Sequence, residues 1–269
     1  GIRGTTAEAI LDAAVLEINN NPALENETSP DASPTTTTKG DNYTEIFRDS
    51  AQVTRSMRLS SHIGDVSDEL DHQVLRVQQK LLKKIARTSL NGRRASSNPE
   101  GSASVKRTMD GIVQSILVGS DPSITDAAGA ALDEDLLNTL LEDVWTKGGR
   151  PTLLVPSPRQ RRKLSLLLEG RQRFTVTDSI LGAVVERFVS DFGILDVLEA
   201  DKFVPGDALL VVDRTKVRMA KLGSQPEMFE VLEIARTGTT ENRETITELT
   251  LEAKNAGDGG HGLLHNLAT

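Results

Sequence analysis

The chain contains no cysteine among its 269 residues. Disulfide bonds, thiolate metal sites and cysteine nucleophiles are therefore excluded. Aromatic residues are scarce as well, with one Trp, one Tyr and six Phe, so little surface exists for stacking the bases of single-stranded nucleic acid. No stretch approaches the ~20 consecutive apolar residues that a membrane-spanning helix needs, and we expect no membrane partner.

The composition is that of a globular protein. Hydrophobic residues make up 37% and charged residues 26%, unlike a disordered or fibrous chain. The length allows one large domain or two interleaved domains with a substantial core. Acidic residues outnumber basic ones by 39 to 31, which gives a net charge of −8 and argues against a general DNA-binding protein.

The N-terminal region contains a long polar segment. Residues Asn19 to Asp41 include a run of asparagines, three prolines and Thr35–Thr38, with almost nothing apolar. Such a segment cannot bury enough surface to offset its ordering entropy, which predicts a long exposed loop. The following residues, Tyr43 to Arg58, alternate loosely between polar and apolar and suggest an extended arm.

The strongest periodic pattern spans Asp65 to Leu90. Apolar residues recur there at intervals of three or four and predict one stripe of an α-helix, roughly 35–40 Å long: Val66, Leu70, Val74, Val77, Leu81 and Ile85. Acidic residues occupy its first turns, and Lys80, Lys83, Lys84 and Arg87 occupy its last, as the helix dipole favours. Asn91-Gly92 is a typical helix end.

The rest of the chain predicts shorter elements. A helix is expected over Asp133 to Lys147, a buried strand over Thr152–Val155, and a second helix from Pro158 to Leu168 with Ser157 as its N-cap. Strands follow, over Ala183–Ser190, Gly193–Leu198, Ala208–Asp213, Val217–Leu222, Met228–Ala235 and Glu244–Ala253. This order predicts an α+β fold.

Two aspartates offer a candidate for enzymatic chemistry. Leu209–Asp213 ends a strand in a carboxylate, as in the magnesium-binding aspartate of phosphate-transfer enzymes, and Asp196 lies on a second expected strand. A metal-dependent phosphotransfer or nuclease domain is thus one interpretation. No G-x-x-x-x-G-K-[ST] phosphate loop accompanies these residues, so a turn aspartate is the simpler interpretation of Asp213.

The histidines do not form a metal-binding pattern. His261 and His265 are four residues apart, but they lie in a glycine-rich stretch, GDGGHGLLHNL, that opposes a helix. On a strand the two rings would be about 13 Å apart, too far to share an ion. His62 and His72 have no carboxylate at ligand spacing, and no serine lies in a G-x-S-x-G elbow. We therefore predict no catalytic residue, no cofactor and no metal ligand, which favours a structural or assembly protein over an enzyme.

A basic cluster remains to be explained. It consists of Arg159, Arg161, Arg162, Lys163, Arg171 and Arg173. One interpretation is a phosphate-binding face. The other is a solvated face, or an ion-pair contact with another subunit against Asp133–Asp135 or Glu142-Asp143, which we favour because charge runs alone are weak signals.

A series of short motifs resembles the major capsid proteins of tailed bacteriophages, and among them the SU10-like family, which has the Hong Kong 97-like capsid fold. The resemblance covers about residues 42 to 267 and depends on the order and spacing of the motifs. They are Asn42–Phe47 (NYTEIF), Val53-Thr54, Leu90-Asn91-Gly92, Arg107–Ile112 (RTMDGI), Val144-Trp145, Gly148, Pro156, Phe192-Gly193-Ile194, Val204-Pro205-Gly206, Glu248–Ala253 and Gly262-Leu263-Leu264.

The resemblance implies a division of the chain. Residues 1–63 would be the N-terminal arm and extended loop, and residues 64–150 the peripheral domain with its spine helix at 65–90. Residues 151–222 would be the axial domain, and residues 223–269 the return strands of the peripheral domain.

The resemblance also implies a function. The chain would self-assemble into hexamers and pentamers of the icosahedral head shell around packaged double-stranded DNA. It would be a virion component assembled in the host bacterial cytoplasm, with portal, scaffolding or decoration proteins as further partners. An encapsulin-like shell that houses an enzyme is the nearest alternative.

Further expectations concern the N-terminal region. The extended loop, roughly Leu16 to Ile63, would lie over a neighbouring subunit, with Ile46, Phe47 and Val53 packed on that neighbour. Lys39 is a conceivable cross-linking lysine, although this family is not known for such links, and the arm lacks the Trp-rich acidic stretch of family members. Because capsid proteins of this fold are often trimmed by a protease, the gene is expected to encode residues before Gly1.

Overall fold

The computed structural model describes residues 39–60, 68–169, 186–198, 202–223 and 227–268. The chain divides by its contacts into two units, residues 1–40 and residues 41–269, and every element below belongs to the second unit. The polar segment expected over Asn19 to Asp41 falls largely outside the described residues, and of the extended loop expected at Leu16 to Ile63 only residues 39–60 are described.

A four-stranded antiparallel sheet is built around one long strand, β9 (Thr240–Ala253). All ten residues of β1 (Glu45–Thr54) pair with β9. β8 (Glu230–Thr237) and β7 (Val217–Lys221) share the other edge of β9. Burial alternates along β9 from Thr245 to Leu251, as its period-two sequence predicts. The predicted strand is confirmed, and it begins four residues earlier.

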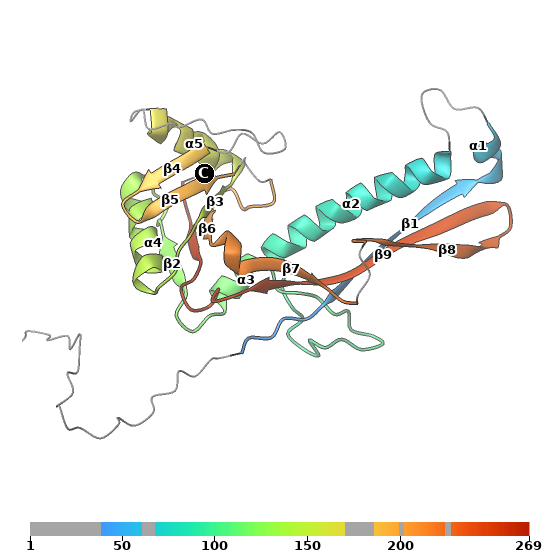
Figure 1. The fold of residues 1–269 in the computed structure, drawn as a ribbon, viewed down its shortest axis with the longest axis horizontal. Coiled ribbons are helices and arrows are strands. Elements are labelled where there is room, and N and C mark those ends of the chain that lie inside the picture. The colour runs from blue at the N-terminus through green and yellow to red at the C-terminus, as the bar shows by residue number, and fades with distance from the viewer. Residues whose placement is uncertain (1–38, 61–67, 170–185, 199–201, 224–226, 269) are drawn as a thin grey trace, which may run out of the picture. The chain divides into compact units, whose positions relative to one another are not determined.

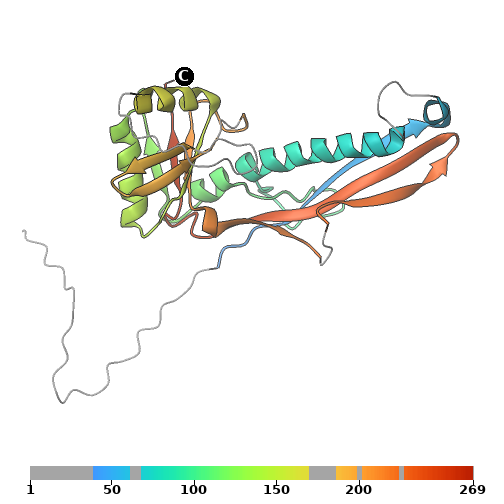
Figure 2. The same cartoon turned by 45° about the horizontal axis from the view of Figure 1, so that its top comes forward.

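The long helix α2 (Glu69–Asn91) lies against this sheet (Figures 1 and 2). The Asp68 side chain caps it by accepting a hydrogen bond from the Leu70 N–H at 2.8 Å. Of the predicted apolar stripe, Leu70, Val74, Leu81 and Ile85 are buried and Val77 is partly buried. The helix is therefore confirmed, and Val66 lies outside the described residues.

The expected role of the lysines of α2 is wrong in one respect. The last turn of the helix carries no basic residue. Lys80 and Lys84 instead lie 2.8 Å and 3.1 Å from the Asp49 carboxylate of β1. Their hydrogen bonds, that of Lys80 above all, lower the pKa of Asp49 to about 2. These two lysines therefore join the helix to the sheet rather than interacting with the negative end of the helix dipole.

A second, six-stranded sheet has the order β2-β10-β6-β3-β5-β4. Its strands are β2 (Ser123–Asp126), β3 (Leu153–Pro156), β4 (Glu186–Ser190), β5 (Gly193–Val197), β6 (Leu209–Val212) and β10 (Gly262–His265). The helices α3 (Ile112–Leu117), α4 (Glu134–Thr146) and α5 (Pro158–Glu169) accompany it, and a short 3₁₀ turn, η1 (Arg214–Lys216), leads from β6 to β7. Four of the strands and two of the helices match the predicted elements, whereas β2, β10 and α3 were not predicted.

Both faces of the six-stranded sheet are covered. Along β6, Leu209 and Val211 belong to a core that includes the apolar face of α4, while Leu210 and Val212 belong to a second core. That second core also contains Leu81 of α2 and residues of the four-stranded sheet. The central strand is therefore apolar throughout, as expected of a strand buried on both sides.

The arm expected over Tyr43 to Arg58 is part of the chain's own fold. It consists of β1 and the short helix α1 (Arg55–Leu59). Phe47 and Val53 are buried in this chain, against Leu81 and Leu70 among others. The expectation that they pack on a neighbouring subunit is wrong, because β1 pairs with β9 and turns these side chains toward α2. Ile46, on the opposite face of β1, is exposed.

Candidate assembly surfaces

Four of the motifs that carry the family resemblance, those at residues 42–47, 90–92, 107–112 and 248–253, meet in space. We call their meeting point the motif junction; it comprises Asn42, Glu45, Asn91, Gly92, Arg107, Asp110, Gly111 and Phe203. Asn42 is central to it. Its Nδ2 donates to the carbonyls of Asp110 (3.0 Å) and Leu251 (2.8 Å), and its Oδ1 accepts from the Asp110 N–H (2.9 Å). One amide side chain thus ties the start of β1 to the loop before α3 and to β9.

Charged groups strengthen the motif junction. Arg107 donates from Nε to the Thr44 carbonyl at 2.6 Å and forms an ion pair with Glu248 of β9. The Met109 N–H donates to the Glu45 carboxylate at 3.1 Å. Burial raises the pKa of Glu45, and this backbone hydrogen bond partly opposes the rise.

Two glycines of the motif junction pack backbone to backbone. The Gly111 N–H donates to the Gly92 carbonyl at 2.9 Å, and a Cβ on Gly111 would lie 2.6 Å from the Gly92 nitrogen. Asn91, just before, donates to the Phe203 carbonyl at 2.6 Å. The helix ends at Asn91 as predicted. Gly92 has a φ of −58°, so close approach rather than a left-handed conformation requires glycine here.

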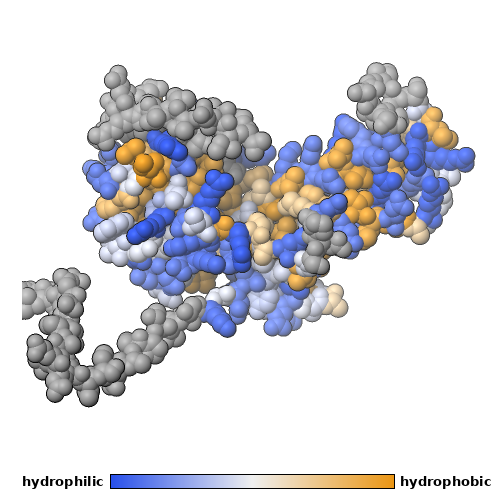
Figure 3. All heavy atoms as spheres, viewed as in Figure 1, coloured by the Kyte–Doolittle hydropathy of each residue, from blue (hydrophilic) through white to orange (hydrophobic). Residues whose placement is uncertain are grey.

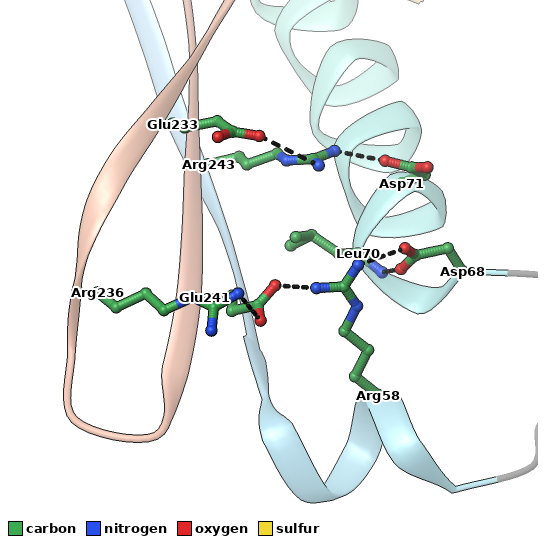
Figure 4. Close-up of polar contacts among 8 residues, drawn as sticks. All are labelled: Arg58, Asp68, Leu70, Asp71, Glu233, Arg236, Glu241 and Arg243. Carbon is green, nitrogen blue, oxygen red and sulfur yellow. Dashed lines mark hydrogen bonds and ion pairs between the residues drawn. The ribbon is translucent and has the colours of Figure 1, made fainter.

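An ion-pair cluster joins the start of α2 to β8, β9 and α1 (Figure 4). Arg58 lies between the carboxylates of Asp68, at 3.0 Å, and Glu241, and Glu241 also contacts Arg236. Hydrogen bonds from Leu70 and then Arg58 lower the pKa of Asp68.

A second arginine completes this cluster. Arg243 of β9 pairs with Asp71 of α2 and, at 3.4 Å, with Glu233 of β8 (Figure 4). Exposed ion pairs contribute little individually. As a network spanning four elements they fix the approach of the helix to the hairpin.

Many large apolar side chains remain exposed in the described part of the chain. Figure 3 shows hydrophobic residues on the viewed face over both sheets. Those that are more than half exposed are Leu59, Leu75, Val118, Trp145, Leu166, Ile194 and Leu222. They come from helices, strands and turns of both sheets rather than from one pocket. An isolated exposed leucine is ordinary, but apolar residues distributed in this way suit a chain with several protein contacts.

The two aspartates considered for catalysis are separated. Asp196 and Val212 both face Leu153 of β3 from opposite sides, which places their backbones two strand spacings, or about 9–10 Å, apart. Asp213 accepts hydrogen bonds from the Thr215 N–H (2.9 Å) and hydroxyl (2.7 Å), and Asp196 pairs with Arg187 at 3.2 Å. The interpretation of Asp213 as a turn residue is confirmed.

The histidines at 261 and 265 also differ in their surroundings. His261 is fully buried and accepts a hydrogen bond on Nδ1 from the Asp213 N–H at 3.0 Å, while His265 is half-buried at the end of β10. Burial lowers the pKa of His261 to about 4, against the opposing effects of the Asp213 carboxylate and the Lys254 backbone. His72 lies on α2, and His62 falls outside the described residues.

The basic cluster is only partly described. Arg159, Arg162 and Lys163 are exposed on α5, whereas Arg171 and Arg173 fall outside the described residues.

Lys39, considered as a cross-linking lysine, is exposed. Within the described ranges no three His, Asp or Glu side chains lie close enough to hold a metal ion. No helix in those ranges is long and apolar enough to cross a membrane.

The chain is similar to several solved structures of encapsulin and capsid proteins. The chain resembles the SrpI encapsulin of Synechococcus elongatus PCC 7942, with a TM-score of 0.60 and 14% identity over 83% of this chain and 74% of the encapsulin. It also resembles a chain of the satellite phage P4 procapsid, with a TM-score of 0.57 and 9% identity over 96% of this chain and 82% of that chain. A chain of an empty GTA particle is similar too, with a TM-score of 0.57 and 13% identity over 93% of this chain and 81% of that chain. The chain thus has the Hong Kong 97-like capsid fold, the class of phage capsids and encapsulins.

The family is narrower than the fold. The model of the SU10 major capsid protein matches residues 4–268, and the chain belongs to this family. It is a capsid protein of a bacteriophage head shell and a virion component. No curated protein matches the chain.

Proposed function

We propose that this chain assembles into hexamers and pentamers of an icosahedral head shell that encloses packaged double-stranded DNA. Assembly takes place in the host bacterial cytoplasm, with portal, scaffolding or decoration proteins as further partners. The chain does no catalysis in this function. The SU10 family match over residues 4–268 carries the proposal, and the exposed apolar residues of both sheets support it, because subunit contacts would cover them.

We further propose a domain assignment. The peripheral domain comprises residues 64–150 and 223–269, with α2 as its spine helix, and residues 1–63 are the N-terminal arm and extended loop. The axial domain begins at residue 151. The pairing of Val217–Lys221 with β9 favours ending the axial domain at about Asp213 rather than at Leu222.

Electron microscopy of the expressed chain, alone and with the other head proteins of its phage, tests the proposal. Closed shells with pentameric and hexameric units are expected. Only monomers or small closed rings across several salt concentrations would contradict it.

An encapsulin-like shell is the second candidate, because the SrpI encapsulin has the same fold. The contents of purified particles separate the two functions. DNA of uniform length supports a phage head, whereas a co-purifying enzyme and a gene neighbourhood without portal and terminase genes would favour the encapsulin.

A further inference from the structure

Helix α4 presents one exposed acidic stripe. Its inward face, with Leu137, Leu140, Leu141 and Val144, is buried in the core. On the outward face, Asp135 and Glu142 are exposed at a spacing of seven residues, which puts them on the same side of the helix. Trp145, one turn beyond Glu142, is 58% exposed although its ring lies 6.2 Å from that of Phe192.

Helix α5 presents an exposed stripe of the opposite charge. Leu164 and Gln160 are buried, and Arg159, Arg162 and Lys163 are exposed on the outward side. Leu166, about one turn beyond Arg162 and Lys163, is 63% exposed.

The charges of both stripes lack partners in the described part of the chain. Arg159, Arg162 and Lys163 form no ion pair with any described residue, and the same holds for Asp135 and Glu142. The neighbouring acidic residues of α4 differ, because Asp133 caps the helix and Asp143 pairs with Lys147 at 3.2 Å. The unpaired charges are therefore those that point outward.

The two stripes are opposite in charge, and they match in spacing at one charged position, that of Glu142, whereas Asp135 lies seven residues before it and beyond the start of α5 in the register described below. In each helix an exposed charged position is followed about one turn later by a large exposed apolar residue. If the helices lie side by side and parallel, Glu142 meets Arg162 or Lys163 in the same register that brings Trp145 against Leu166. Complementary charges fix the register of such a contact, and the apolar pair contributes buried area.

We propose that the α4 stripe of one copy docks on the α5 stripe of a second copy of this chain. The contact joins two different faces, so it is heterologous, and a heterologous contact closes into a ring when its rotation divides a full turn. This inference rests on the proposed function and assigns one of its subunit contacts to named residues.

A charge-swap experiment tests the contact. The variant R162E/K163E reverses the α5 stripe, and D135K/E142K reverses the α4 stripe. Each double variant is expected to lower the yield of sedimenting particles about tenfold, because like charges then face each other. The quadruple variant restores opposite charges and should recover the yield to within about threefold of wild type, since the two effects are coupled.

Controls separate this contact from other causes. Lys83→Glu changes an exposed lysine of α2 without an ion pair to a described residue, and it should leave the yield unchanged. Circular dichroism and thermal unfolding of the unassembled variants verify that each remains folded. Recovery in the quadruple variant is the result that a general loss of stability cannot produce.

The outcomes distinguish the hypotheses. If wild type forms shells and the double variants do as well, or if the quadruple variant stays as poor as the doubles, the inference is wrong and the proposed function stands. If R162E/K163E keeps the particle yield but reduces the DNA within the particles, the α5 stripe faces nucleic acid and the inference is again wrong. If wild type forms no oligomer at all, the proposed function fails, and the inference fails with it.

A second test uses the absence of native cysteine. In E142C/K163C each copy can form a disulfide with the next, and mild oxidation should give a ladder of linked subunits up to the ring size. E142C/K83C is the matched control and should give no ladder. A ladder in both variants, or in neither while shells still form, would overturn the proposed contact.

Discussion

At the scale of single residues, two pairs of glycines determine how closely backbones approach. Gly92 meets Gly111 in the motif junction, and Gly119 meets Gly257, where a Cβ on Gly119 would lie 2.1 Å from the Gly257 Cα. The sequence identifies Gly92 as a helix end, but nothing local to it indicates its partner nineteen residues later. The fold of the chain, rather than a local pattern, brings Gly92 and Gly111 together.

Gly111→Ala is expected to destabilise the protein by about 1–3 kcal/mol, as overpacking does. The added methyl group would meet the Gly92 and Leu90 backbones at 2.6–2.7 Å, and neither can move without disturbing the end of α2. Urea unfolding of the unassembled chain measures the loss. Gly206→Ala is the control, because a Cβ there has nothing within 4 Å; equal stability of the two variants would contradict the prediction.

His261 makes the stability of the fold depend on pH. Its folded-state pKa of about 4 lies below the ordinary histidine value of 6.5 because the side chain is buried. The unfolded chain therefore binds the proton more readily, and stability falls as pH decreases from about 6.5 toward 4. Protonation would also cost the hydrogen bond that Nδ1 accepts from Asp213.

His261→Asn should flatten this dependence, because asparagine retains an acceptor near the Nδ1 position and does not titrate. Between pH 7.5 and pH 5 the variant should lose about 2 kcal/mol less stability than wild type. Unfolding titrations at the two pH values measure the difference. His72→Gln is the control that tests whether the loss of any histidine has this effect. If the free energy of unfolding of H261N falls with pH as steeply as that of wild type, another group is responsible for the dependence.

At the scale of elements, α2 shows what periodicity can and cannot predict. The spacing from Leu70 to Ile85 identified the buried face correctly, since a 3.6-residue period depends only on local geometry. The partner of Lys80 and Lys84 was not predicted. Their contact with Asp49, more than thirty residues away in β1, depends on strand pairing that no local pattern contains.

Two adjacent leucines of α2 test this face directly. Leu81 is 0% exposed and Leu82 is 45% exposed. Leu81→Ala should cost about 2–5 kcal/mol through lost burial and the cavity left behind. Leu82→Ala should remain within about 0.5 kcal/mol of wild type. Urea unfolding compares them, and similar losses would mean that the helix packs on a different face.

At the scale of the whole molecule, residues 41–269 form a compact unit separate from residues 1–40. The polar composition of Asn19 to Asp41 favours contacts with a neighbouring subunit over packing within the chain. Deleting Ser29–Thr38 should leave the circular dichroism and thermal midpoint of the unit unchanged while lowering the particle yield.

Limited proteolysis separates a role in assembly from a passive one. Cleavage within residues 29–38 is expected in the unassembled chain, and protection is expected in particles. Equal cleavage in both states would assign the assembly contacts to other surfaces, such as the α4 and α5 stripes.

The sequence alone determined the buried face of α2, the helix at α4, the alternation of β9, the turn role of Asp213 and, through the order of its motifs, the family. The structural features among these depend on residues near one another along the chain, and the order of the motifs can be read without knowing the fold. Only the tertiary structure decided that β1 turns Phe47 and Val53 inward, that Gly262–His265 forms a strand, and that four of the motifs meet at the motif junction. Asn42 bonds Leu251 across 209 positions, and such a contact carries no periodic signal, because chain topology rather than local preference brings its two residues together.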